Sequence, residues 1–91
     1  MSTVRIPPVL RETVGGARTV SATGATVAEL LQDLFAHHPA LRDRLTDAGQ
    51  LSSFVNVYLN DRDIRYRDGL QTAVGPDDTL ILLPAMAGGQ R

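Results

Sequence analysis

The sequence predicts an α+β fold in which a mixed sheet packs against one main helix. Three observations lead to this prediction: a pair of short β-prone segments near the start, one amphipathic helix pattern after them, and later β-prone segments that end in an apolar run. The chain has 91 residues, of which 43% are hydrophobic, so it has the size of a single domain with one core.

The first β-prone segments predict a hairpin. Apolar residues between Val4 and Leu10 indicate a first strand, which Pro7-Pro8 end or bulge because proline cannot donate a hydrogen bond to a sheet. Gly15-Gly16 marks a turn, and residues 19–22 then form the second strand.

The main helix is predicted to begin after Thr26. Thr26 and Glu29 have the spacing of a capping box, in which the threonine hydroxyl accepts a hydrogen bond from a first-turn amide while the glutamate reaches back. One apolar stripe follows at helical spacing, made of Val27, Leu30, Leu31 and Leu34. The helix ends at His37-His38, because the residue before Pro39 is pushed out of the α region.

The second half of the chain alternates turns and β-prone segments. A short helical turn over residues 41–45 leads into a loop through Gly49-Gln50. Three strands are then expected, over residues 54–59, 63–66 and 79–83. The last of them is almost continuously apolar, which suits a central position in the sheet. This order of elements is that of the β-grasp fold, in which the first and last strands pair in parallel and leave the C-terminus free at one end of the sheet.

Composition and charge narrow the function classes. Without cysteine the chain has no thiolate nucleophile, disulfide framework or sulfur-ligated metal site. A formal net charge of -1 gives no broad attraction to nucleic acid or to an anionic membrane, and the first residues lack a signal peptide. We therefore expect a cytoplasmic protein with no nucleic-acid or membrane partner. All nine basic residues are arginine, so a tag of this kind could not be extended through its own lysines.

The residues after the last strand are the most informative. We divide the chain into a domain over residues 1–84 and a flexible tail over residues 85–91 that contains Gly88-Gly89. Because glycine has no Cβ, a Gly-Gly segment can enter a narrow channel and leaves its carboxylate open to an activating enzyme. Gln90 and Arg91 lie beyond the glycines, so the sequence as given does not present a glycine carboxylate. The segment expected to thread into a partner's site consists of Pro84, Ala85, Met86, Ala87 and Gly88.

Other candidate residues have simpler structural interpretations. Adjacent His37 and His38 point in different directions and no third ligand stands at zinc spacing, so we expect neither a metal site nor a cofactor. Tyr66 between Arg65 and Arg67 is compatible with a docking surface, although an exposed edge strand is the interpretation we favour. Core or sheet packing is expected for Phe54, Tyr58 and Leu59. For Leu83 and Met86, contact with a partner and a purely structural role both stay open.

Two stretches carry a family resemblance. One runs from Phe54 to Val74 and includes Phe-Val-Asn-Val-Tyr-Leu-Asn-Asp-Arg-Asp-Ile-Arg and Gly-Leu-Gln-Thr-Ala-Val, and the other is Leu-Leu-Pro-Ala-Met-Ala-Gly-Gly, ending at Gly89. On these residues the chain resembles the MoaD/ThiS type of bacterial sulfur-carrier protein, and within that type the carrier of a cysteine-forming pathway. The resemblance extends over almost the whole chain. It implies a ubiquitin-like fold and a function in sulfur transfer.

The resemblance further implies that the protein is a co-substrate and not an enzyme. An E1-like adenylating enzyme would activate the Gly89 carboxylate, which a sulfur donor would convert to a thiocarboxylate. The acceptor would lie on a PLP-dependent cysteine synthase or on the route to a sulfur-containing secondary metabolite. The resemblance also implies that Gln90 and Arg91 are removed by proteolysis before Gly89 reacts, and that a JAMM-type zinc metalloprotease acts on the carrier. Three alternatives stay open: the small subunit of molybdopterin synthase, a ubiquitin-like modifier joined to lysines of other proteins, and an interaction module with an inert tail.

Overall fold

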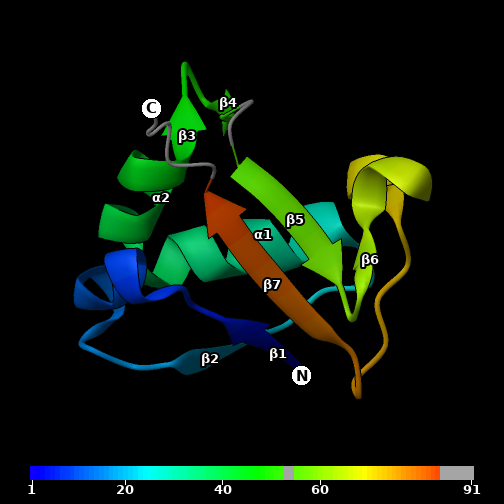
Figure 1. Cartoon of the computed structure of the whole chain (residues 1–91), viewed down its shortest axis with the longest axis horizontal. Coiled ribbons are helices and arrows are strands. Elements are labelled where there is room, and N and C mark those ends of the chain that lie inside the picture. Colours follow the sequence, from blue (N-terminus) through cyan, green and yellow to red (C-terminus); the bar gives the residue numbers. More distant parts are fainter. Residues whose placement is uncertain (53–54, 85–91) are drawn as a thin grey trace.

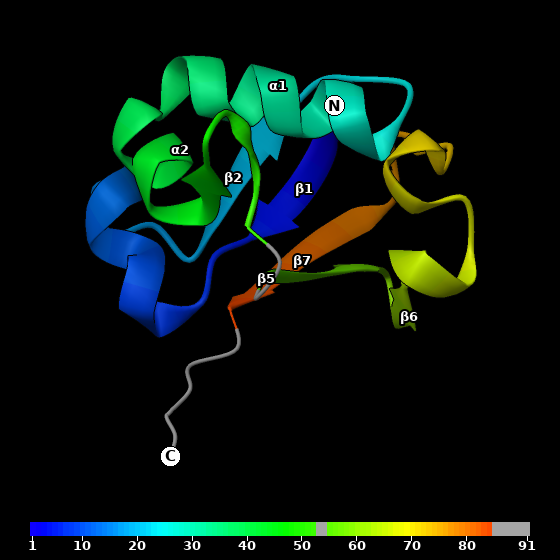
Figure 2. The same ribbon diagram turned by 90° about the horizontal axis from the view of Figure 1, so that it is seen from above.

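A computed structural model describes residues 1–52 and 55–84, as a mixed sheet covered on one face by helices (Figure 1, Figure 2). The five strands of this sheet have the order β2-β1-β7-β5-β6. They are β1 (Ser2–Arg5), β2 (Thr19–Ala22), β5 (Val55–Leu59), β6 (Arg62–Asp63) and β7 (Thr79–Pro84). β7 is central and runs parallel to β1, and the other neighbours are antiparallel. The expected β-grasp fold, ubiquitin-like with a mixed sheet on one main helix, is confirmed.

The main helix α1 (Val27–His37) forms as the sequence predicts. The Thr26 hydroxyl accepts a hydrogen bond from the Glu29 backbone N–H at 3.2 Å, and the Glu29 carboxylate accepts one from the Ala25 N–H at 3.0 Å. These bonds satisfy amides at the start of the helix that have no partner within it. His38 caps the other end, immediately before Pro39.

The core lies between α1 and one face of the sheet. The four apolar residues of the α1 stripe are all buried, and they face alternate residues of the strands, which are Val4, Val55, Val57, Leu59, Leu80 and Leu82. Because strand side chains alternate between faces, the residues between these belong to the opposite face. Figure 2 shows that α1 and α2 (Pro39–Leu45) lie on one side of the sheet and leave its other face open.

The chain after β1 differs from the expected strand. Val9 and Leu10 belong to a 3-10 helix, η1 (Pro8–Val14), whose Leu10 and Val14 are buried in the core. Proline is favoured in the first turn of a helix because its missing N–H has no partner there. Pro7-Pro8 therefore end the strand and begin a helix instead of bulging a longer strand.

The segment after α1 is more regular than expected. α2 begins at Pro39, two residues before the predicted helical turn, again with proline at its start. The predicted loop through Gly49 contains a small ladder of β3 (Thr46–Asp47) and β4 (Gln50–Leu51). Ala48 and Gly49 turn the chain between these strands with positive φ angles of 55° and 81°.

Of the three strands predicted after this ladder, β7 extends one residue further than expected, to Pro84, and the strand over residues 63–66 differs from the prediction. β5 is described from Val55 onward, and Phe54 lies outside the described residues. The expected 63–66 strand is wrong beyond Asp63, because residues 64–66 form the 3-10 helix η2 (Ile64–Tyr66). The Asp63 carboxylate accepts a hydrogen bond from the Arg65 backbone N–H at 2.9 Å and so begins that turn. A further 3-10 helix, η3 (Gly69–Gln71), occupies the predicted turn at residues 68–70. Within the described residues, every helix is too short or too polar to cross a membrane.

Candidate functional site at the end of β7

Of the candidate site, the structure describes the residue at its beginning, where the chain leaves the sheet. Pro84 is the last residue of β7 and pairs with Val55 of β5. The other residues predicted from the sequence to form the site lie outside the described residues; they are Ala85, Met86, Ala87, Gly88, Gly89, Gln90 and Arg91. The described part of the site is therefore the strand that leads into the tail and the surface around it.

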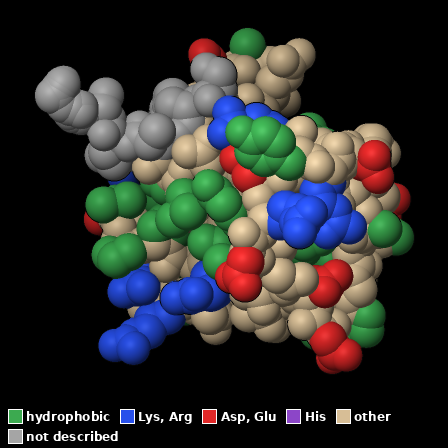
Figure 3. Space-filling model, turned by 45° about the vertical axis from the view of Figure 1, so that its right-hand side comes forward, with side chains coloured by type: hydrophobic (Ala, Val, Ile, Leu, Met, Phe, Trp, Pro, Cys, Tyr) green, Lys and Arg blue, Asp and Glu red, His purple; other side chains and the backbone are tan. Residues whose placement is uncertain are grey.

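The open face of the sheet carries a mixed apolar and basic surface beside this strand. The register places Ile81 of β7 between Arg5 of β1 and Tyr58 of β5, and places Leu83 opposite Asn56. Leu83 is 43% exposed, so of its two expected roles the core position is wrong. Figure 3 shows hydrophobic side chains gathered on this side of the molecule with arginine side chains around them. We call Arg5, Asn56, Tyr58, Ile81 and Leu83 the open-face surface.

Tyr58 belongs to this surface and not to the core. Val55, Val57 and Leu59 are buried, whereas Asn56 and Tyr58 between them are half-buried on the other face. Of the residues assigned to core or sheet packing, Leu59 is in the core as expected and Tyr58 packs on the sheet's open side. The period-2 alternation of residues 55–59 is the sequence signal for this division.

A hydrogen-bonded cluster of the polar side chains of Arg65, Asp63 and Asn56 lies at the border of the open-face surface. The Arg65 guanidinium donates through Nη2 to Asp63 Oδ2 at 2.8 Å and to Asn56 Oδ1 at 3.2 Å. The side-chain hydrogen bond from Arg65, helped by its backbone N–H, lowers the pKa of the Asp63 carboxyl, and the same bond raises the pKa of Arg65. The group ties η2 and β6 to β5. Asp63 was expected only as part of a strand, and no local signal marks Asn56, because the contact of both residues with Arg65 depends on the fold of η2.

Tyr66 lies outside the expected edge strand. It is 83% exposed, in η2, with exposed Arg65 and Arg67 on either side of it in the chain. Arg65 is committed to Asp63 and Asn56. The edge-strand interpretation that we favoured is therefore wrong for Tyr66, and its exposed ring leaves docking of a partner as a prediction.

The beginning of β7 is held by a second polar group. Asp78 accepts a hydrogen bond from the Gly75 N–H at 2.7 Å and one from the Asn60 side-chain amide at 3.1 Å. The hydrogen bond from the Gly75 N–H, and after it the one from the Asn60 amide, lower the pKa of the Asp78 carboxyl. Asn60 in turn accepts from the Thr79 N–H at 3.0 Å, so the first residue of β7 is fixed in position.

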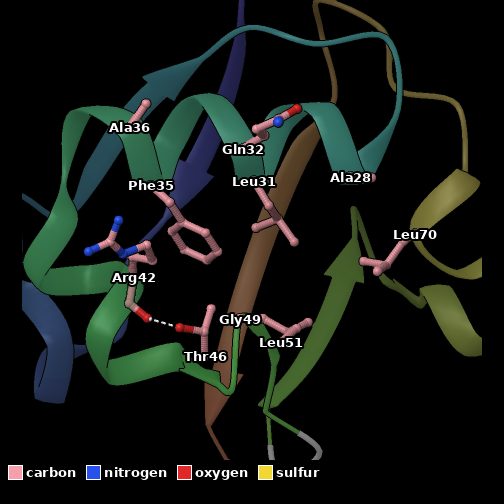
Figure 4. Close-up of a pocket in the computed structure, with 10 residues that line it drawn as sticks. All are labelled: Ala28, Leu31, Gln32, Phe35, Ala36, Arg42, Thr46, Gly49, Leu51 and Leu70. Atoms are coloured by element: carbon pink, nitrogen blue, oxygen red, sulfur yellow. Dashed lines mark hydrogen bonds between the residues drawn. The ribbon is translucent and has the colours of Figure 1, made fainter.

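A groove lies on the helix side of the sheet. It has a volume of about 430 Å³ and is lined mainly by apolar side chains, with Arg42 its charged residue. Figure 4 shows Leu31 and Phe35 of α1 pointing into it toward Leu51 of β4. This groove has no local sequence signal, because it forms where the β3–β4 ladder meets α1.

The two histidines contribute to the end of α1. His37 Nδ1 lies 2.9 Å from the Asp33 carbonyl oxygen and 3.5 Å from Asp33 Oδ1, and His38 is the C-cap. Across residues 1–52 and 55–84, no three His, Cys, Asp or Glu side chains come together in the manner of a metal site.

Known proteins are similar to this chain in sequence and in fold. Residues 4–89 match the ThiS family. Sulfur carrier protein CysO of Mycobacterium tuberculosis is 44% identical over 90 residues, covering 96% of this chain and 97% of the relative. Small archaeal modifier protein 3 of Haloferax volcanii is 37% identical over 65 residues, which is 71% of each chain.

A solved structure agrees with the sequence comparison. The crystal structure of the Amycolatopsis orientalis BexX/CysO complex contains a chain that is 45% identical, with a TM-score of 0.87 and coverage of 98% of this chain and 100% of that one. The match to the family reaches through Gly89, and the resemblance inferred from the sequence is confirmed. The chain belongs to the ThiS family of small sulfur-carrier proteins.

Proposed function

We propose that this protein carries sulfur as a thiocarboxylate on Gly89. Removal of Gln90 and Arg91 exposes the glycine carboxylate, one of whose oxygens attacks the α-phosphate of ATP on an E1-like enzyme and releases pyrophosphate. Sulfide-level sulfur (HS⁻) from a sulfur donor then attacks the acyl carbon. The new C–S bond replaces the C–O bond to AMP, which leaves with that oxygen, and the product is the Gly89 thiocarboxylate. The observation that carries this proposal is the 44% identity to CysO, together with a Gly-Gly pair shortly after a central strand.

The sulfur acceptor that we propose is an activated serine held as an aminoacrylate on a PLP-dependent cysteine synthase. A JAMM-type zinc metalloprotease trims the carrier and releases the product. A biosynthetic enzyme for a sulfur-containing secondary metabolite is the second acceptor we consider. In these schemes the protein serves as a co-substrate in the cytoplasm.

The geometry around β7 supports delivery of the tail into another protein. Pro84 to Gly89 is six residues, which can extend over ~20 Å from the end of the sheet. The open-face surface lies beside the start of this segment, and it combines apolar groups with an arginine as protein interfaces do. We propose that it rests on the partner while the tail reaches the reacting centre. BexX, which forms a complex with a 45% identical CysO, is a suitable probe for such docking.

The first test is the intact mass of the protein after co-expression with an activating enzyme and a trimming protease. We expect loss of Gln90 and Arg91 and the mass gain of one oxygen-to-sulfur exchange. The Gly89→Ala variant should be cleaved less well by the trimming protease or converted to the thiocarboxylate far more slowly. The reason is that the added Cβ hinders entry of the tail into a narrow active-site channel of the partner enzyme. Retention of both residues and no exchange in the unsubstituted protein would contradict the proposal.

A second candidate is a protein modifier, which the 37% identity to small archaeal modifier protein 3 favours. In that role the activated Gly89 would form isopeptide bonds with lysines of other proteins. Proteomic detection of Gly-Gly remnants that depend on Gly89 would support it. Because all nine basic residues are arginine, such tags would not be extended through lysine side chains of this chain.

For the small subunit of molybdopterin synthase, the corresponding test is co-purification with a pterin-binding subunit.

A further inference from the structure

The strand β2 forms a free edge of the sheet. It stands first in the order β2-β1-β7-β5-β6, so within the described residues it has a neighbour on one side only. Figure 1 shows β2 at the lower border of the view, with no helix or strand beyond it. Thr19 and Ser21 of this strand are both exposed. Sheet edges are commonly protected by charged side chains, proline or a bulge, and the β2 ladder contains none of these between Thr19 and Ala22.

The pairing of β2 with β1 determines which backbone groups of β2 point outward. The Ile6 N–H donates to the Arg18 carbonyl at 2.8 Å, so these opposite residues form a hydrogen-bonded pair. Hydrogen-bonded and non-hydrogen-bonded pairs alternate along antiparallel strands. Val20 therefore belongs to the next hydrogen-bonded pair, whereas Thr19 and Ser21 do not. The N–H and C=O groups of Thr19 and Ser21 accordingly point to the free edge, where no backbone group of another described element bonds to them.

We propose that the free edge of β2 pairs with β2 of a second copy of this chain, in an antiparallel arrangement with a two-fold axis at Val20. Thr19 of one copy then lies opposite Ser21 of the other, and this pair exchanges both of its N–H···O=C bonds. The symmetry repeats the same pair on the other side of the axis. The inference goes beyond the proposed function, because it concerns how the carrier associates with itself.

The proposed register is the one that uses both outward-facing residues. A shift that places Ser21 on the axis would pair Thr19 with Thr23 of the second copy. The Thr23 N–H already donates to Asp33 Oδ2 of α1 at 2.9 Å, so it is not available. A shift that places Thr19 on the axis would pair Ser21 with Ala17, which lies outside β2. The arrangement centred between Thr19 and Ser21 is therefore the one that satisfies both edges.

The side chains of β2 also match across this axis. Val20 is half-buried against the core, and the axis brings it next to Val20 of the second copy. The side chains of a non-hydrogen-bonded pair approach closely, so this contact removes exposed apolar surface from water. On the open face the hydroxyls of Thr19 and Ser21 lie side by side, a pairing that stabilises antiparallel strands.

Opposite charges meet in the same arrangement. Arg18 lies on the helix side of the sheet, because the Ile6 opposite it is buried in the core. The register places Arg18 opposite Ala22 of the second copy, next to the Thr23 N–H that binds the Asp33 carboxylate. Arg18 is exposed, and across residues 1–52 and 55–84 it forms no ion pair within its own chain. The Asp33 side chain keeps 32% of its surface exposed and is therefore accessible to Arg18 of the second copy.

Pairing through β2 leaves the rest of the molecule accessible. β1 separates β2 from β7, so the open-face surface of each copy stays uncovered. The two-fold axis makes the two β7 strands run in opposite directions, and their ends at Pro84 lie at opposite ends of the joint sheet. Each copy can therefore bind an enzyme without blocking the other.

The first test is sedimentation velocity of the full chain from about 10 µM to about 1 mM, the range of weak complexes. β2 has four residues, so we expect a weak dimer whose fraction rises with concentration. In ¹⁵N-labelled protein the amide protons of Thr19 and Ser21 should move downfield over the same range, because they gain hydrogen bonds. The Val20 amide, which bonds to β1, is the internal reference and should move little.

The variant Ser21→Pro removes the donor of one hydrogen bond from each pair at the edge. Proline is accommodated in an edge strand where the N–H points to solvent. We expect the dissociation constant of the dimer to rise at least about tenfold, since a neutral hydrogen bond is lost on each side of the axis. Ser21→Ala is the matched control, because it changes the same side chain and keeps the N–H. It should change the dissociation constant less than about threefold.

The variant Val20→Cys tests the position of the axis. Opposite Cα atoms of a non-hydrogen-bonded pair lie about 4.5 Å apart, within the range of a disulfide. The chain has no cysteine of its own, so oxidised glutathione should convert Val20→Cys to a disulfide-linked dimer. Val74→Cys is the matched control, because Val74 is also a partly buried valine packed against the core, and it should cross-link far more slowly.

Thermal unfolding checks that each variant is folded before the dimers are compared. If Ser21→Pro is unfolded, the comparison of Val20→Cys with Val74→Cys decides. A protein that stays monomeric at about 1 mM, or a dimer that folded Ser21→Pro leaves intact, overturns the pairing through β2. Thr19 and Ser21 amides that move on addition of BexX but not on concentration also overturn it, because the edge would then bind an enzyme. The mass at Gly89 tests the proposed function separately.

Discussion

The two ends of β7 differ in how firmly the fold holds them. At its start, Asn60 and Asp78 fix the Thr79 N–H and the preceding loop, and neighbouring strands pair on both sides. At its end, only β5 pairs with the strand within the described residues, and Leu83 is exposed. One end of β7 is thus fixed by hydrogen bonds to the rest of the domain, and the other end contributes an exposed side chain to the open-face surface. This difference holds the start of β7 firmly while Leu83, near its end, stays exposed.

The largest effect on stability should appear when substitutions on the two faces of β7 are compared near Pro84. Leu82 is fully buried, whereas its neighbour Leu83 faces the open side. Leu82→Ala should lower the free energy of unfolding by about 2–5 kcal/mol, because it leaves a cavity in the core. Leu83→Ala should change it by less than about 0.5 kcal/mol. Urea denaturation measures both, and equal losses would show that the end of β7 is packed like its middle.

A smaller effect on binding should follow from changing the open face. Leu83→Asp places a carboxylate in the apolar part of this surface, and we expect affinity for BexX to fall at least about tenfold, or ~1.4 kcal/mol. Thr3→Asp puts the same charge on the open face beside the start of β7 and serves as the matched control. Unfolding free energies of the two variants should stay close to that of the unsubstituted protein. Equal losses of affinity would point to overall charge instead of a localised contact.

The smallest expected effect concerns the pH dependence of the anchored end. The Gly75 N–H and the Asn60 amide lower the folded-state pKa of Asp78, so its contribution to stability is complete above the unfolded pKa of about 4. That contribution is lost as the pH falls through the lower, folded-state pKa. Asp78→Asn should therefore be less stable than the unsubstituted protein near neutral pH, with the gap narrowing in acid.

Denaturation at about pH 7 and about pH 3, which lie above and below the unfolded pKa of about 4, measures how far this gap narrows. Asp77→Asn is the control, because Asp77 is its exposed neighbour in the same loop. A gap for Asp78→Asn that is constant with pH would mean that the Asp78 carboxylate does not stabilise the start of β7.

Local signals explain which elements the sequence predicted well. α1 has its cap, its apolar stripe and its stop within one short segment, so its formation needs no information from elsewhere. The strand expected through Leu10 failed because apolar residues after Pro7-Pro8 suit a helical turn as well as a strand, and only packing decides between them. The strand expected through Tyr66 failed for a similar reason, since the Asp63 side chain replaces a ladder bond with a turn.

The candidate site was predictable in part. Gly88-Gly89 and the strand before them are a contiguous motif, and the match to the ThiS family covers them. The open-face surface was not predictable, because it joins residues from β1, β5 and β7 that meet only through their register. The unequal pairing of β7 likewise follows from the partner of Arg5, 76 positions later in the chain at Ile81.

The parallel pairing of β1 and β7 has a practical consequence. Ser2 lies at the start of β7, where its hydroxyl donates to the Gly75 carbonyl at 2.8 Å. The amino terminus thus stands one strand length, roughly 20 Å, from Pro84. An affinity tag or a fluorophore attached before Met1 would therefore lie at the opposite end of β7 from Pro84. Protein immobilised or labelled at the amino terminus should accordingly keep the end of β7 accessible to its partner enzymes. Amino-terminal fusion is therefore the suitable design for capturing these enzymes.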